Sequence, residues 1–286
     1  MDARSLLLLA LGLVAVAFVA FWGRALVAES RRVRPTGWEL VVGVITDFFD
    51  TLGIGSYATT TTLYRARDTV EPGEIPGTLN VGHAVPTFAQ ALIYTELVEV
   101  EPTTLIGMIG AAVAGAWLGA SVVTRLDKVQ VLRGMGVALL VAAALTAGRA
   151  ADVLPGGGVA TGLTGGTLAL GLAGNFVLGA LMTLGIGLYG PCMILVGLLG
   201  MDPKAAFPIM MGSCAFLMPL ANVRFIQAGR YAPGAALGLT LGGLPAVLVA
   251  AWIVQSLPLD VVRWLVVAVV TWTAASMLRQ AQAAPA

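Results

Sequence analysis

Charged residues are scarce in this chain. They make up 11% of its 286 residues, whereas an average soluble domain has roughly 25%. Hydrophobic residues make up 58%, and the mean hydropathy is +0.91. So few charges cannot solvate the surface of a soluble protein of this size. A net charge of +1 also gives no basic field for nucleic acid. The composition therefore excludes a soluble enzyme, a nucleic-acid-binding protein and a disordered chain.

Cysteine and histidine are also scarce. Cys192 and Cys214 both lie in apolar stretches, in a pattern that fits neither a disulfide framework nor a zinc site. The single histidine, His83, has no serine at a recognisable nucleophile turn, and the phosphate-binding motif GxxxxGK[ST] is absent. We therefore expect no metal, no cofactor and no enzymatic activity.

Long apolar segments are what the chain has in abundance. The first, residues 5–23, is followed by Arg24, Arg31, Arg32 and Arg34. It is long for a signal peptide and lacks a well-formed cleavage site, so we expect a retained helix whose basic end is cytoplasmic. The other segments are 38–64, 75–98, 102–124, 129–148, 162–200, 205–228, 232–256 and 259–280. The pattern predicts an all-α integral membrane protein.

The segments are organised as an internal repeat. The sequence LGIGSY at 52–57 recurs as LGIGLY at 184–189, and Pro102 recurs as Pro233 at nearly the same shift. Each half then contains four apolar segments in the same order. We expect an N-terminal helix and basic loop over 1–34, repeats over 35–148 and 162–286, and a linker over 149–161. All of these belong to one membrane domain.

The distribution of lysine and arginine favours inverted repeats. If every segment crosses the membrane, the basic residues divide 8 to 8 between the two sides. If 38–64 and 162–200 each dip in and return, they divide 12 to 4, as the positive-inside rule expects. Charge alone does not separate this from a chain in which only 38–64 re-enters, and the repeat favours the symmetric arrangement. The N-terminus is then outside and the C-terminus cytoplasmic, in a cell inner membrane.

Glycines mark where the two re-entrant helices would break. Gly53 and Gly55 in the first repeat correspond to Gly185 and Gly187 in the second. Glycine permits a helix to break without a Cβ clash. The half-helix that follows each break would offer free N–H groups and a positive dipole end, which suit an anion. We therefore expect the substrate between the repeats, at the breaks.

Polar side chains near the breaks are the candidate binding residues. They follow a break or lie in the next apolar segment: Tyr57, Thr59, Thr60, Asn80, His83, Tyr189, Cys192 and Ser213. The alternatives are threonines bonded to their own helix carbonyls and ordinary interhelical hydrogen bonds. Asp47 and Asp50 share a helix face and have no counterpart in the second repeat. They are candidates for proton or sodium coupling, or alternatively for capping a helix end.

Four stretches of the chain resemble the sulfite exporter TauE/SafE (TSUP) family of permeases. They are LGIG at 52–55, IPGTLNVGH at 75–83, YGPC at 189–192 and AFPIMMGSC at 206–214, and the resemblance covers about residues 38–280. Family members usually carry a run of glycines at the break, where this chain has G-x-G. The resemblance implies transport of small sulfur-containing anions, such as sulfite, thiosulfate or an organosulfonate such as sulfoacetate.

The sequence thus predicts a secondary transporter that works by alternating access. Its partners would be a small anionic substrate, the lipid bilayer and H+ or Na+ as coupling ion, with a homodimer left open. An anion channel and a membrane enzyme or scaffold without transport remain alternatives.

Overall fold

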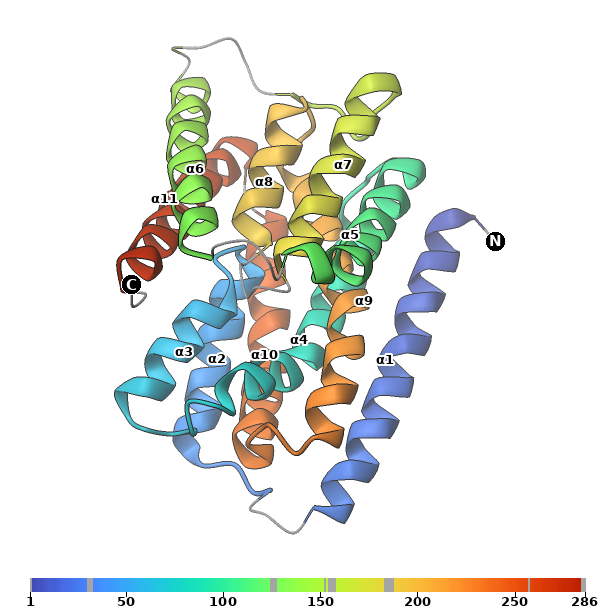
Figure 1. Ribbon diagram of the computed structural model, residues 1–286. Helices are drawn as coiled ribbons and strands as arrows, with labels where there is room; N and C mark the ends of the chain where they lie inside the picture. The colour runs from blue at the N-terminus through green and yellow to red at the C-terminus, as the bar shows by residue number, and fades with distance from the viewer. Residues whose placement is uncertain are drawn as a thin grey trace. The chain divides into compact units, whose positions relative to one another are not determined.

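The chain is helical throughout the part that the structure describes. This computed structural model describes residues 2–29, 33–123, 128–151, 153, 158–182, 188–256 and 258–283. Within those ranges there is no strand beyond an isolated bridge between Ala160 and Met201. The helices are α1 (Ala3–Ala28), α2 (Gly37–Thr51), α3 (Ser56–Ala66), α4 (Ile75–Leu97), α5 (Pro102–Val123), α6 (Lys128–Ala150), α7 (Gly165–Met182), α8 (Tyr189–Leu198), the 3₁₀ turn η1 (Pro203–Ala205), α9 (Ala206–Gln227), α10 (Pro233–Ser256) and α11 (Leu259–Ala283) (Figure 1).

Four helical segments among the described residues are long and apolar enough to cross a membrane. They are Ala3–Ala28, Gly165–Met182, Pro203–Gln227 and Pro233–Ile253. At about 1.5 Å per residue, the 26 residues of α1 extend about 39 Å, more than the roughly 30 Å of a bilayer's hydrocarbon core. These findings confirm the predicted all-helical fold, the N-terminal helix and the presence of membrane-length helices.

The chain forms two compact units. The first unit comprises Met1–Glu96 and Cys214–Gln255, and the second comprises Leu97–Ser213 and Ser256–Ala286. Each unit therefore takes helices from both predicted repeats. In the first unit, α1 packs on α4, where the rings of Phe18 and Phe88 lie 6.0 Å apart.

The order of helices recurs in the two halves of the chain. In each half, two successive helices, α2 and α3 or α7 and α8, are followed by three long helices. The starting residues match the shift seen in the sequence: α3 begins at Ser56 and α8 at Tyr189, while α5 begins at Pro102 and α10 at Pro233. The order and the bounds of the helices are compatible with a duplication, which stays a prediction.

The first predicted break is present. α2 ends at Thr51 and α3 begins at Ser56, and between them Gly53 (φ 94°) and Gly55 (φ 84°) adopt left-handed backbone conformations that suit glycine. Figure 1 shows α3 returning beside α2. With 15 and 11 residues, the two helices are about 22 Å and 16 Å long, so neither crosses a bilayer alone.

The second predicted break falls between α7 and α8, in the second unit. Gly185 and Gly187 lie outside the described residues. α8 has 10 residues, about 15 Å, and is too short to cross a bilayer by itself. α7 differs from its counterpart α2 in being long and apolar enough to cross.

The backbone of α4 is supported by α10 at a proline. Pro86 lies inside α4 and has no N–H, so the carbonyl of Gly82 loses its usual helical donor. The Thr240 hydroxyl from α10 donates to that carbonyl at 2.6 Å. A Cβ on Gly82 would lie 2.9 Å from the Ala236 carbonyl, so glycine permits this close approach.

Gly43→Ala tests the tight packing of α2 on α10. A Cβ at Gly43 would lie 2.6 Å from the Leu239 carbonyl, so the helices must separate to admit it. We expect the free energy of unfolding to fall by about 1–3 kcal/mol, measured by denaturant titration in detergent. Gly37→Ala is the matched control, because nothing lies within 4 Å of a Cβ there. Equal stability of the two variants would contradict this packing.

Glu101→Gln tests the start of α5 in the second unit. The Glu101 carboxylate accepts hydrogen bonds from the backbone N–H groups of Thr103 (2.9 Å) and Thr104 (2.7 Å), which hold its pKa at about 2, below the ordinary 4.5. Because the pKa is lowered in the folded state, this stabilisation is present above pH 4.5 and is lost as the pH falls towards 2. We expect Glu101→Gln to cost about 1 kcal/mol at pH 7 and nothing in strong acid.

The control for that prediction is Glu99→Gln, at an exposed carboxylate two residues earlier. Thermal unfolding at pH 7 should separate the two variants. A stability loss for Glu101→Gln that is the same at pH 7 and in strong acid would contradict the capping role.

Candidate functional site

Three elements of the first unit position a buried polar network. Asp47 and Asp50 lie on one face of the last turns of α2, directly before the break. α4 presents His83 and Gln90 on the face that also carries Asn80, with spacings of three and seven residues. Asp47, Asp50, His83 and Gln90 are each at most 3% exposed. Ionisable groups buried to this extent in an apolar helical protein require partners.

The centre of the network is a chain of three side chains from α2, α4 and α3. His83 Nδ1 lies 2.9 Å from Asp47 Oδ1, and His83 Nε2 lies 3.0 Å from Thr60 Oγ1. The Thr60 hydroxyl also donates to the Ser56 carbonyl at 2.8 Å. Both ring nitrogens of His83 are therefore engaged within the protein, and neither is free to bind a substrate in this conformation.

Asp50 forms a second group of contacts around the break. Its Oδ1 accepts the Ser56 N–H at 2.6 Å, which caps the start of α3. Its Oδ2 accepts Nε2 of Gln90 at 3.0 Å, and the same amide nitrogen donates to Thr51 Oγ1 at 2.9 Å. The N-terminus of α3, where an anion was expected, is thus occupied by the protein's own carboxylate. Asp50 therefore caps a helix end, which was the alternative to a role in ion coupling.

Tyr57 and Asn80 form the half-buried edge of the network. The Tyr57 hydroxyl donates to Asn80 Oδ1 at 3.0 Å, and Asn80 Nδ2 donates to the Pro76 carbonyl at 3.0 Å. The Tyr57 ring stacks on His83 with a centroid distance of 6.1 Å. These two predicted residues present the polar atoms of the network that are nearest to solvent.

The remaining predicted residues make helix-packing or helix-internal contacts. The Thr59 hydroxyl donates to the Ser56 carbonyl at 2.8 Å. This is a bond to a carbonyl of its own helix, the alternative to a substrate contact. In the second unit, the Ser213 hydroxyl donates to the Ile209 carbonyl at 2.7 Å and accepts from Asn175 at 3.2 Å. Tyr189 and Cys192 are buried in α8.

The first unit therefore brings together most of the predicted residues. Thr60, Asn80 and His83 lie with Tyr57 and the two aspartates, whereas Tyr189, Cys192 and Ser213 belong to the second unit. The sequence did not reveal the roles of Ser56 and Gln90. The available signal for Gln90 was its position seven residues after His83, on the same face of α4.

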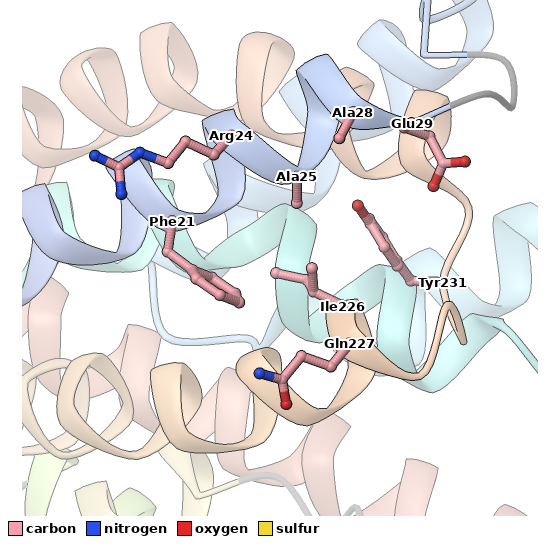
Figure 2. Close-up of a pocket in the computed structure, with 8 residues that line it drawn as sticks. All are labelled: Phe21, Arg24, Ala25, Ala28, Glu29, Ile226, Gln227 and Tyr231. Carbon is pink, nitrogen blue, oxygen red and sulfur yellow. The ribbon is translucent and has the colours of Figure 1, made fainter.

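A pocket lies elsewhere in the first unit, at the end of α1. Its volume is about 520 Å³. Figure 2 shows its lining residues, which are Phe21, Arg24, Ala25, Ala28, Glu29, Ile226, Gln227 and Tyr231. None of them belongs to the buried network. Among the described residues, no group of three or more histidine, cysteine, aspartate or glutamate side chains is arranged to hold a metal ion.

The fold and the site define an all-helical protein with membrane-length helices, an interrupted helix and a buried ionisable network. Comparison of the chain with known protein families, curated proteins and solved structures finds no match.

Proposed function

We propose that this protein is a secondary transporter of small anions in a cell inner membrane, working by alternating access. The observation that carries the proposal is the interruption between α2 and α3, surrounded by the buried side chains of Asp47, Asp50 and His83. Non-helical backbone at membrane depth is tolerated only within protein or beside a cavity. Ionisable side chains inside a membrane protein most often serve ion or substrate pathways.

The helix pattern supports inverted repeats. Each half has two successive helices followed by three long ones, and the first pair is interrupted at Gly53 and Gly55. If each interrupted pair enters and leaves on the same side, each half crosses an odd number of times, and the second half has the opposite orientation. Transporters built this way bind substrate where their broken helices end.

The two half-helix ends differ, and the difference favours an anion at α8. The start of α3 is capped by Asp50, whereas the corresponding position in the second repeat is Met182. Tyr189 and Cys192 lie in the first turn of α8. A helix N-terminus favours negative charge, and no aspartate stands at the position that corresponds to Asp50. We assign the anion to this end.

The sulfur chemistry of the substrate rests on the resemblance to sulfite exporter permeases. Thiosulfate, sulfite and an organosulfonate such as sulfoacetate are the substrates it implies. Each presents a compact anionic group that suits backbone N–H donors at a helix end.

Uptake of ³⁵S-thiosulfate into proteoliposomes tests the proposal. We expect saturable uptake that empty liposomes lack and that sulfite or sulfoacetate inhibits. Uptake that rises linearly with concentration, without competition, would indicate the channel alternative. Liposomes that remain impermeable to all three anions would overturn the proposal.

A further inference from the structure

The side chains of Asp47, His83 and Thr60 are joined in series by hydrogen bonds. These bonds can be satisfied in two ways, which differ by one proton. We propose that this group of side chains is the proton-coupling site of the transporter, and that the Thr60 hydroxyl changes its acceptor as the Asp47–His83 pair gains or loses that proton. This inference rests on the proposed transport function, to which it adds the coupling ion and the responsible side chains.

The observed contacts fit the protonated state when Thr60 donates to Ser56. The Thr60 hydroxyl has one hydrogen, which it donates to the Ser56 carbonyl at 2.8 Å. Its oxygen must then accept from His83 Nε2 at 3.0 Å, so Nε2 carries a hydrogen. A second proton lies between His83 Nδ1 and Asp47 Oδ1, 2.9 Å apart. This second proton belongs either to the His83 ring or to the Asp47 carboxyl group. In both cases the Asp47–His83 pair has no net charge.

Loss of one proton rearranges these bonds. The pair becomes a carboxylate and a neutral imidazole that keeps its hydrogen on Nδ1, facing Asp47. His83 Nε2 is then an acceptor. The Thr60 hydroxyl must turn from the Ser56 carbonyl to Nε2. Because Ser56 is the first residue of α3, loss of the proton releases a hydrogen bond at the start of that helix.

Because the Asp47–His83 pair is buried, we expect it to be protonated when a substrate anion is bound. Asp47, His83 and Thr60 are all 0% exposed. The pair has no net charge when protonated and a charge of −1 when deprotonated, and a buried net charge is costly. In an anion transporter, bound substrate adds further negative charge, which a bound proton offsets. Anion and proton therefore move together: water on one side supplies the proton, and water on the other side receives it.

Other titratable groups around the pair do not replace it in this role. Asp50 on α2 already accepts from Ser56 and Gln90, so its carboxylate is satisfied by donors. Tyr57 on α3 stacks on the ring, and Cys214 on α9 interacts with Tyr57. From α10, glycine 243 faces Asp47 Oδ2, which has no hydrogen-bond partner in the described part of the chain.

A proton fits this site better than sodium. Sodium requires several oxygen ligands, whereas one oxygen of Asp47 is already bound to His83. The neighbouring ring nitrogens are proton acceptors by nature.

The single histidine makes the test direct, because ¹⁵N NMR of the imidazole reports on His83 alone. As the pH rises, we expect Nε2 to lose its hydrogen while Nδ1 keeps its own. Asp47→Asn should leave the neutral ring with its hydrogen on Nε2. Thr60→Val should alter the Nε2 signal, whereas Thr59→Val should not, because Thr59 donates to the same carbonyl without contacting the ring. The proposal would be overturned if, at high pH, the wild-type imidazole kept its hydrogen on Nε2. It would also be overturned if His83 did not titrate while the protein is folded.

A transport measurement separates this inference from the proposed function. A pH-sensitive dye inside the proteoliposomes should report acidification as thiosulfate enters, and Asp47→Asn should abolish that acidification. Thiosulfate entry without acidification in the wild type would refute proton coupling and leave the transport function standing. No thiosulfate entry, with the expected NMR titration, would refute the transport function and leave the two-state proton site.

Discussion

Replacing His83 with alanine is expected to lower the free energy of unfolding by about 3–5 kcal/mol. Asp47 is fully buried. Its Oδ1 atom is paired with His83, and its Oδ2 atom has no hydrogen-bond partner among the described residues. The variant therefore leaves an uncompensated charge in an apolar interior. Denaturant titration of the purified protein in detergent measures the loss.

A double variant, Asp47→Asn with His83→Gln, is the control for this prediction. It removes both charges while keeping groups of similar size and polarity, so we expect it to cost much less than His83→Ala alone. Equal losses for the two would mean that the volume of the ring, rather than the ion pair, stabilises this part of the first unit.

Asp50→Ala is expected to lower the free energy of unfolding by about 3 kcal/mol, because hydrogen bonds to a charged group contribute roughly 1.5–3 kcal/mol each. The variant removes the acceptor of the Ser56 N–H, which caps α3, and of the Gln90 amide from α4. Both donors are buried, with Ser56 3% exposed and Gln90 fully buried. Loss of the cap should also loosen the start of α3, detected as faster hydrogen exchange there.

Asp50→Asn provides the comparison. Its amide oxygen still accepts from Ser56, so we expect a loss of about 1 kcal/mol and unchanged exchange at the start of α3. If Asp50→Ala were as stable as the wild type, or if exchange were equal in the two variants, Asp50 would not be the cap.

Local sequence signals were enough to predict the outline of the fold. The break at Gly53 and Gly55 follows from glycine's freedom at positive φ, and α2 ends and α3 begins on either side of it. The starts of α5 at Pro102 and α10 at Pro233 follow from the repeat and from the preference of proline for the first turn of a helix.

The partners within the site could not be predicted in the same way. His83 was expected to face substrate, and the structure pairs it with Asp47, 36 residues away in the chain. That pairing depends on how α2 and α4 are rotated about their axes, which a broad apolar pattern does not determine. The hydrogen bond between Ser213 and Asn175 likewise depends on the packing of α9 on α7. Gly185 and Gly187 lie outside the described residues, so the second break stays a prediction.

Counterflow tests the central claim of a carrier with one alternating site most directly. Proteoliposomes are loaded with unlabelled thiosulfate and diluted into a trace of ³⁵S-thiosulfate. A carrier exchanges internal for external substrate, so the account predicts that label transiently accumulates above its equilibrium level and then declines. Label that rises to equilibrium without an overshoot, or does not enter at all, would contradict the account.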